Sequence, residues 1–352
     1  MAGVRPSRRP TQADVARLAG VSPGVVSAVI NGRHDGGVIR ASAGTAQRVM
    51  DAVRKLGYVP NVAARNLAGG RNNIIGVFTY EAVFPTDQLN FYHGFLIGVE
   101  EAVEELDANL LLFTGSRGSG RRRSIYKNGV NSLQVADGAI MLGQDEDRQE
   151  LAALVASRFP VVYIGHRELP AGELSYVTAD YAEATARLVH RCAELGHQRL
   201  VLLRGDDDAE SVLARQSGYF TACQENSVIE SGAVHRVGAD GPAPELLRSL
   251  LDQGVTCVVT DDASHAESVY RQAIDSGLRV PDDVSVVSLG DYAGMRPADP
   301  SITSLLTPRR EMGAAAVRLL AELLATPEGG KPRQTILACG LREGETLAPR
   351  RS

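Results

Sequence analysis

Polar side chains follow several short apolar runs of the chain, and their types suit the binding of a polar molecule. Tyr80 ends the run "NNIIGVFTY", His166 follows "PVVYIG", Asp262 ends "CVVTDD" and Asp291 ends "VSVVSLGD". Carboxylates form charge-assisted hydrogen bonds and therefore suit hydroxyl-rich ligands. Phe91 could add a stacking face, although core packing is the commoner role of any single aromatic residue. We therefore predict a binding site for a polar ligand.

The sequence carries no motif of a common catalytic or metal site. The patterns Gly-x-x-x-x-Gly-Lys and His-Glu-x-x-His are absent. His166, His190, His197 and His265 are scattered, without metal-ligand spacing. The cysteines form no Cys-x-x-Cys pair, which is typical of unpaired thiols in a reducing cytosol. We expect no metal, no other cofactor and no enzymatic activity.

The spacing of the apolar runs predicts the elements that carry these residues. From about residue 74 onward, short apolar runs typical of buried strands alternate with segments of helical period, such as residues 91–106. This alternation predicts an α/β fold with two doubly wound parallel sheets. Ligands of such sheets bind beyond the carboxyl ends of the strands, where the polar residues above lie.

Charge divides the chain into two parts of opposite sign. Residues 1–72 contain eleven Lys and Arg residues and three acidic residues, whereas the whole chain has a net charge of −5. A basic head on an acidic body indicates that the head alone meets a polyanion. A solvated basic face without a partner is the alternative interpretation of the charge.

The stretch "TQADVARLAGVSPGVVSAVIN" predicts a helix-turn-helix within the basic part. Thr11 with Asp14 is a helix start of the capping-box type, and Gly20 ends that helix. Ser22 caps the next helix, with Pro23 at its first position. Two short helices joined by a tight turn form the helix-turn-helix motif, although an ordinary helical hairpin would show the same pattern.

Four segments, "DVARLAGVS", "VSAVIN", "LGYVPNVAARNLAGGRNNIIGV" and "GLRVPDDVSVVSLGD", resemble the lactose-repressor (LacI) family of bacterial transcription regulators. The resemblance runs from about Thr11 to Ile336. It implies an all-α helix-turn-helix head and a body of two subdomains shaped like a periplasmic sugar-binding protein. The expected parts are a head at 1–60, a hinge helix and linker at 61–73, an effector-binding and dimerisation domain at 74–345 and a tail at 346–352. Subdomain one is expected at about 74–177 and 306–333, and subdomain two at about 178–305 and 334–345.

The resemblance also implies which residues meet DNA. In this family the segment that matches "NVAARNLAGG" folds on operator DNA, and the leucine that matches Leu67 wedges between base pairs in the minor groove. A linker residue packed on its own protein is the alternative role for Leu67. Many relatives have arginine at Ala28, so we expect thymine-methyl contacts and dependence on DNA shape instead. The predicted DNA-binding residues are Thr11, Ser22, Pro23, Gly24, Val25, Ser27, Ala28, Asn31, Arg33, Arg40, Asn61, Ala64 and Leu67.

For the body, the resemblance implies that Arg215 and Asp262 hold a small effector. Gly290 stands where the family usually has an acid, and Gly165 and His166 stand where an acid and a base are common. The expected effector is therefore a small polar molecule, with a carbohydrate favoured but no particular sugar indicated. The predicted effector-binding residues are Tyr80, Phe91, His166, Arg215, Asp262 and Asp291.

Taken together, these patterns predict a cytoplasmic, ligand-responsive transcription regulator without a membrane segment. We expect a repressor that binds a pseudo-palindromic double-stranded operator as a homodimer. A sugar-binding or enzymatic protein of the same fold is one alternative. A regulator that senses a protein partner is another.

Overall fold

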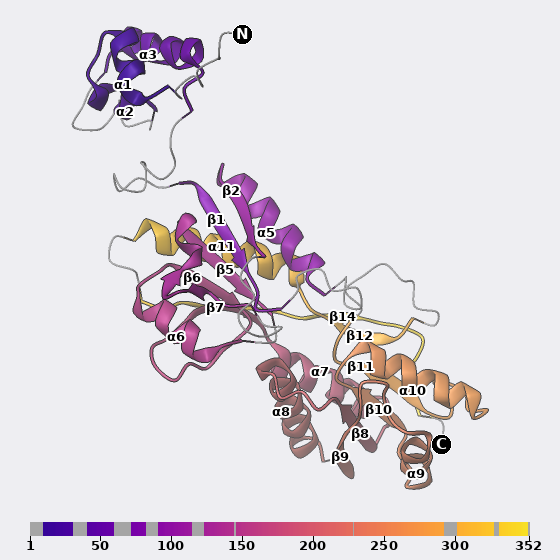
Figure 1. Cartoon of the computed structure of the whole chain (residues 1–352). Coiled ribbons are helices and arrows are strands. Elements are labelled where there is room, and N and C mark those ends of the chain that lie inside the picture. Colours follow the sequence, from indigo (N-terminus) through magenta and orange to yellow (C-terminus); the bar gives the residue numbers. More distant parts are fainter. Residues whose placement is uncertain are drawn as a thin grey trace, which may run out of the picture. The chain divides into compact units, whose positions relative to one another are not determined.

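The structure is a computed structural model, and it divides the chain into two compact units, Met1–Asn72 and Asn73–Ser352, which we call the head and the body (Figure 1). Each unit is described by itself. The structure describes residues 10–30, 41–59, 72–81, 91–114, 123–143, 146–227, 229–291, 301–326 and 331–350.

The head is built from the helices α1 (Gln12–Ala19), α2 (Pro23–Ile30) and α3 (Ala43–Leu56). The predicted caps are confirmed: Thr11 forms a capping box with Asp14, and Gly20 ends α1 in the left-handed conformation at φ 65°. Ser22 Oγ accepts a hydrogen bond from the Val25 N–H at the start of α2. The small core of the head contains Val15, Ala16, Ala19, Val26, Val29, Val49 and Ala52.

Among the described residues, no single helix is long and apolar enough to cross a membrane. The pair α1 and α2 passes that test only when its two helices are joined across a bend of 102°. Their apolar side chains Val15, Val26 and Val29 are buried against α3 in the head core, which accounts for their hydrophobicity.

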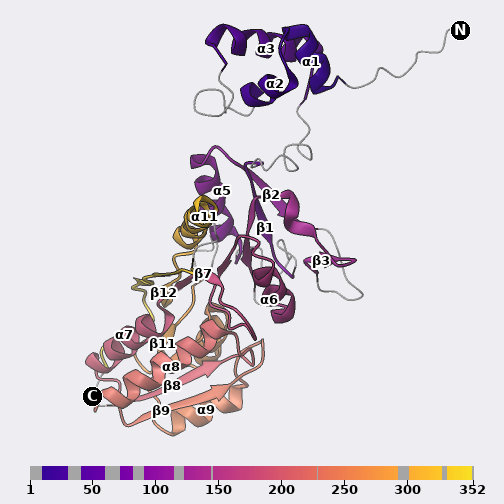
Figure 2. The same ribbon diagram turned by 90° about the vertical axis from the view of Figure 1, so that its left-hand side faces the viewer.

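The body contains two six-stranded sheets that form separate lobes (Figures 1 and 2). The first sheet has the order β13-β7-β6-β5-β1-β2, and the second has the order β14-β12-β11-β10-β8-β9. The strands are β1 (Ile74–Phe78), β2 (Asn109–Phe113), β5 (Gly138–Leu142), β6 (Val161–Ile164), β7 (Ser175–Ala179), β8 (Arg199–Arg204), β9 (Ser231–Arg236), β10 (Cys257–Thr260), β11 (Ser285–Ser288), β12 (Thr303–Leu306), β13 (Gln334–Leu337) and β14 (Gly340–Arg342), with a small hairpin of β3 (Tyr126–Lys127) and β4 (Val130–Asn131). The helices are α5 (His93–Glu105), α6 (Arg148–Ala156), α7 (Tyr181–Glu194), α8 (Glu210–Glu225), α9 (Pro244–Asp252), α10 (Ala263–Asp275) and α11 (Arg309–Ala325), with a 3₁₀ turn at Ser132–Val135.

Each sheet is covered by helices on both faces, as the alternation of its buried residues requires. In β8, Leu200 and Leu202 belong to the apolar cluster of α7 and α8, whereas Val201 and Leu203 belong to that of α9 and α10. The first sheet lies in the same way between α6 and the pair α5 and α11 (Figure 2). The predicted α/β class with two parallel, doubly wound sheets is therefore confirmed, with β14 as an antiparallel edge strand.

The end of the body differs from the expected subdomain boundaries. Residues 334–345 were expected in the second subdomain, but β13 pairs with β7 in the first sheet, and the chain crosses to the second sheet only before β14. The expected tail also packs onto the second lobe. Thr346 is buried there, and its hydroxyl donates to the Val286 carbonyl at 2.6 Å. In neither segment is the apolar pattern strong enough to predict which lobe the segment packs on.

The contact between α5 and α11 depends on two glycines. A Cβ added at Gly98 would lie 1.8 Å from the Arg310 carbonyl oxygen, and one at Gly313 would lie 2.1 Å from the Phe95 carbonyl oxygen. Gly98→Ala is therefore expected to lower the free energy of unfolding of the body by about 1–3 kcal/mol, because backbone cannot move aside as a side chain would. Chemical denaturation followed by circular dichroism measures this loss.

Gly44→Ala is the matched control for that substitution. Gly44 lies in α3, and no heavy atom lies within 4 Å of a Cβ added there. Alanine is favoured over glycine within a helix by about 1 kcal/mol, so this variant should be as stable as the parent or slightly more stable. Equal stability of Gly98→Ala and the parent would contradict the tight packing of α5 on α11.

Candidate functional site

The exposed start of α2 is the candidate DNA-reading face of the head. Ser22, Pro23 and Gly24 are exposed, while Val25 and Ser27 are half-buried. Gln12 of α1 donates from Nε2 to the Pro23 carbonyl at 3.1 Å, which fixes the second helix against the first. The helix sequence PGVVSAVI has no charged side chain, so any base reading by α2 must use short side chains and backbone.

Two of the predicted DNA-binding positions have a structural role in the head. Ala28 was predicted on the exposed face of α2, but it is buried, with only 8% of its surface exposed. Thr11 donates from Oγ1 to the Asp14 carboxylate at 2.6 Å, and its hydrogen bonds hold the pKa of Asp14 below the ordinary value. The positions Asn31, Arg33, Arg40, Asn61, Ala64 and Leu67 lie outside the described residues.

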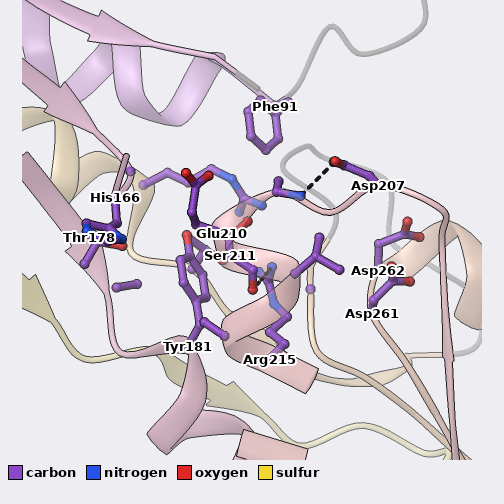
Figure 3. Close-up of a pocket in the computed structure, with 18 of the residues that line it drawn as sticks. Phe91, His166, Thr178, Tyr181, Asp207, Glu210, Ser211, Arg215, Asp261 and Asp262 are labelled. Carbon is purple, nitrogen blue, oxygen red and sulfur yellow. Dashed lines mark hydrogen bonds between the residues drawn. The ribbon is translucent and has the colours of Figure 1, made fainter. Parts of the chain in front are cut away.

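In the body, a cavity of about 1150 Å³ lies between the two sheets. The ends of β5, β6 and β7 line one side, and the segments after β8, β10 and β11 line the other. In Figure 3, Phe91 points into the cavity from the first lobe, while Arg215, Asp261 and Asp262 come from the second. The cavity is thus at the carboxyl ends of parallel strands, where ligands of such sheets bind.

Acidic side chains outnumber basic ones on the cavity wall. Several are already paired; for example, Asp180 lies 3.1 Å from Arg187. An acidic wall of this kind favours a neutral or cationic ligand over an anionic one. The charged lining residues are Asp180, Glu183, Asp206, Asp207, Glu210, Asp261, Asp262 and Asp291 against Arg167, Arg215 and Arg309.

Arg215 is held in the cavity by its neighbours and not by Asp262. Its guanidinium carbon lies 4.3 Å from the centre of the Tyr181 ring, and its Nε donates to the Leu289 carbonyl at 3.0 Å. Asp262 lies on another part of the wall, and its side chain is 50% exposed (Figure 3). A planar donor and an exposed acceptor therefore face the cavity at separate points, which suits a ligand with several hydroxyl groups.

Three more predicted residues line the cavity, and neighbouring side chains hold each of them in place. Phe91 packs edge-on against Tyr92 at 5.1 Å between ring centres, and the His166 ring lies 4.8 Å from that of Tyr176. Asp291 accepts from Arg309 Nη1 at 2.7 Å, so this carboxylate holds the start of α11. Arg309 Nε is buried and, among the described residues, has no hydrogen-bond partner. A ligand oxygen could satisfy that donor.

Tyr80 does not line the cavity, contrary to the prediction. Its side chain is 1% exposed, its ring lies edge-on to Phe78 at 5.0 Å, and its hydroxyl donates to the Asp147 carbonyl at 3.4 Å. Phe78 faces the α6 side of the first sheet, and alternation along the chain directs Tyr80, two residues later, to the same side. Burial raises the pKa of Tyr80, as expected for a core phenol.

Sequence reasoning missed a network of four charges that joins the two lobes. Arg167 Nε lies 2.8 Å from Glu146, and its Nη1 lies 3.1 Å from Glu210. Arg148 lies 3.1 Å from Glu146 and 3.0 Å from Glu210. Glu210 begins α8 of the second lobe, whereas the other three residues belong to the first. We call Arg148, Arg167, Glu146 and Glu210 the charge clasp.

The charge clasp is expected to stabilise the arrangement of the two lobes. Glu210→Gln should lower the free energy of unfolding of the body by roughly 1–2 kcal/mol, a value between those of exposed and buried ion pairs. The loss is moderate because Arg167 still forms its ion pair with Glu146 in this variant. Denaturation at low and high salt measures the loss. Glu105→Gln is the control, since Glu105 pairs with Arg318 on the exposed surface and should cause no measurable change. Equal losses in both variants would contradict the role of the clasp.

The acid pair of the second lobe contacts His265, a residue that was not predicted to belong to the site. His265 Nδ1 lies 2.7 Å from Asp261 Oδ1, and its Nε2 lies 3.1 Å from the Gly238 carbonyl oxygen. The Asp261, Asp262 and His265 ligand atoms lie within 4.8 Å of one another, a spacing that a metal ion could use. Both ring nitrogens already face acceptors, so neither keeps a lone pair for a cation.

Comparisons with known proteins agree with this arrangement. Residues 11–61 match the model of the bacterial regulatory proteins of the lacI family, and residues 189–347 match the periplasmic binding protein-like domain. The HTH-type transcriptional regulator CelR of Thermobifida fusca is 31% identical over 345 residues, which cover 96% of this chain and 98% of that protein. Catabolite control protein A of Priestia megaterium is 25% identical over 88% of this chain and 91% of its own.

Solved structures of the same family superpose on nearly the whole chain. A transcriptional regulator CelR–cellobiose complex matches with a TM-score of 0.60 at 27% identity, over 96% of this chain and 100% of its own. The Lac repressor dimer bound to operator and the anti-inducer ONPF matches with a TM-score of 0.70 at 22% identity, over 97% and 100%. The helix-turn-helix head, the two-lobed body and these similarities together show that the chain is a DNA-binding transcription regulator and belongs to the LacI family.

Proposed function

We propose that this protein is a repressor whose operator binding is controlled by a carbohydrate bound in the cavity of the body. The observation that carries the proposal is the arrangement of Arg215 and Asp262. A guanidinium of α8 stacked on Tyr181 and an exposed carboxylate at the start of α10 reach the cavity from separate elements, so that one polyhydroxylated ligand can engage both. The similarity to a regulator solved with cellobiose supports this ligand class.

The charge of the wall narrows the ligand class. Asp206 and Asp207 line the cavity beside the acid pair, so a phosphorylated or carboxylated sugar would meet repulsion there. The unsatisfied Arg309 Nε and the ring of Phe91 lie on the opposite side and offer a donor and a stacking face. A neutral sugar is therefore favoured, and the cavity of about 1150 Å³ has room for a disaccharide.

We further propose that the protein acts as a homodimer on a pseudo-palindromic operator. Two head domains related by a two-fold axis would read two half-sites. Ligand in the cavity would change the relative position of the two lobes, and thereby the spacing of the two heads. The ligand can influence DNA binding only through its different affinity for the two arrangements.

The test is a ligand screen followed by an operator assay. Thermal shifts are measured with neutral mono- and disaccharides, including cellobiose and ribose, and with their phosphorylated or carboxylated analogues. Operator DNA, selected from random sequence with the full chain, is then titrated with and without the best ligand. A neutral sugar should raise the melting temperature and change operator affinity. A screen in which only anionic analogues bind, or in which no sugar binds, would overturn the proposal.

A further inference from the structure

His265 of α10 lies at the junction of three segments that line the cavity. Its ring reaches Asp261 after β10 and the Gly238 carbonyl after β9. Asp261 Oδ2 in turn accepts from the Gly205 N–H at 2.8 Å, which ties the segment after β8 to the same point. Residues of all three segments line the cavity, although His265 itself is only 3% exposed.

The hydrogen bonds of His265 define its charge. Nδ1 faces a carboxylate oxygen at 2.7 Å and Nε2 faces a carbonyl oxygen at 3.1 Å, and both oxygens are acceptors. An imidazole ring can satisfy two acceptors only when both nitrogens carry hydrogen, which is the cationic form. The hydrogen bond to Asp261 raises the pKa of His265 against the opposing effect of burial, in agreement with this geometry.

The surroundings of the ring contain acids. Asp261 precedes α10, and Asp262 caps it, with Asp262 Oδ2 at 3.5 Å from Nδ1. Among the described residues, these two carboxylates are the charged groups that raise the pKa of His265. The segments after β8 and β9 contribute only backbone groups here, the Gly205 N–H to Asp261 and the Gly238 carbonyl to the ring. The cation therefore offsets part of the negative charge of the cavity wall.

The same residue also fixes Asp262. The His265 backbone N–H donates to Asp262 Oδ1 at 2.9 Å, and the Ser264 hydroxyl donates to the same oxygen at 2.6 Å. Both oxygens of Asp261 are thus used within the protein, whereas Asp262 stays half-exposed toward the cavity. Asp261 acts as a bridge between His265 and Gly205, and Asp262 remains available to a ligand.

We propose that His265 is a positioning residue of the effector site, which as an imidazolium holds Asp261 and the three lining segments in the arrangement that binds ligand. The inference rests on the proposed function, since it concerns affinity for the same carbohydrate. Deprotonation would remove the Nε2 proton, because Nε2 faces a neutral carbonyl whereas Nδ1 faces a carboxylate. The Nε2 lone pair would then face the Gly238 carbonyl oxygen, and the segment after β9 would lose its anchor to His265.

The first measurement concerns the free protein. The full chain is labelled with ¹⁵N-histidine, and the ring signals of His265 are assigned from their absence in His265→Gln. At a pH of about 6.5, where an ordinary histidine is half protonated, both His265 nitrogens should carry protons. A neutral His265 ring at that pH would overturn the inference, whatever the ligand proves to be.

The second measurement is ligand affinity between pH 6 and 8.5, by calorimetry with cellobiose or the sugar that gives the largest thermal shift. Because the pKa of His265 is raised, affinity should be constant below that pKa and fall roughly tenfold above it. His265→Gln should bind roughly tenfold more weakly at the low end of this pH range and lose the pH dependence.

Two further variants separate this role from a general loss of structure. Asp261→Asn removes the charge and replaces one of the two acceptor oxygens by an NH2 group, so it should abolish the pH dependence even if His265→Gln folds poorly. His190→Gln is the matched control, because the His190 side chain is 38% exposed and lies 3.8 Å from Glu225, and it should keep the parent profile. A ligand affinity of the parent that does not change with pH would overturn this inference but not the proposed function. The same pH dependence in Asp261→Asn as in the parent would do so too. Absence of any sugar binding would overturn the proposed function as well.

Discussion

Arg215→Ala is expected to weaken effector binding ten- to a hundredfold while operator affinity in the absence of effector stays unchanged. The guanidinium lies over the Tyr181 ring and donates to the Leu289 carbonyl, so it is preorganised toward the cavity. Loss of a hydrogen bond from a charged group costs roughly 1.5–3 kcal/mol, which corresponds to that change in the dissociation constant. Calorimetry with the sugar and an operator titration measure the two effects separately.

Two controls make this result specific. Arg215→Lys keeps the charge but loses the planar stack and the fixed donor geometry, so it should recover only part of the affinity. Arg318→Ala removes an arginine of an exposed pair with Glu105 and should bind the sugar like the parent. If Arg215→Ala responded to the effector as the parent does, the assignment of the cavity as the effector site would be wrong.

Leu67→Ala is expected to lower operator affinity on the order of a hundredfold with little effect on stability. Leu67 lies outside the described residues, and its role follows from the resemblance of "NVAARNLAGG" to the hinge of the LacI family. An apolar side chain inserted between base pairs supports a bend worth a few kcal/mol, which corresponds to about two orders of magnitude in affinity. Fluorescence anisotropy with labelled operator measures the loss.

The control for Leu67 is an exposed leucine elsewhere in the chain. Leu341 in β14 is 43% exposed, and Leu341→Ala should leave operator affinity unchanged. Thermal unfolding of both variants shows whether either affects folding. Normal operator affinity in Leu67→Ala would contradict the wedge and favour a linker residue packed on its own protein.

The elements could be predicted from the sequence where local signals were strong. The capping residues Thr11 and Ser22, and the left-handed Gly20, correctly predicted where the first two head helices begin and where the first one ends. Apolar runs gave the parallel strands of both sheets. The strand β13 was assigned to the wrong lobe because a half-buried edge strand has no pattern that names its partner.

The candidate site was less predictable, because it depends on the direction of side chains. Position at a strand end placed Asp262, His166 and Asp291 at the cavity, but the same rule failed for Tyr80, which alternation turns to the α6 side. The prediction that Ala28 meets DNA was wrong for a similar reason, since a short helix has few positions that are fully exposed. Residues adjacent in sequence can thus face different surroundings.

The contacts that sequence reasoning missed are those between distant segments. Arg167 and Glu210 are 43 residues apart and meet only because two lobes are placed against each other. His265 follows β10 and Gly238 follows β9, and these two strands are separated by β8 in the second sheet. Ser211 is a cavity residue that could have been predicted from the sequence. It lies four residues before Arg215 on α8, and residues at this spacing share one face of a helix, so both line the cavity.

The central claim, that ligand in the body cavity controls DNA binding by the head, is tested most directly by measuring the coupling in both directions. Operator affinity is determined with and without saturating sugar, and sugar affinity is determined with and without saturating operator, for the full chain. Because the two equilibria share one thermodynamic cycle, the same factor should appear in both, typically about 5–150-fold. Unchanged operator affinity at saturating sugar, in a protein that binds both, would contradict the account.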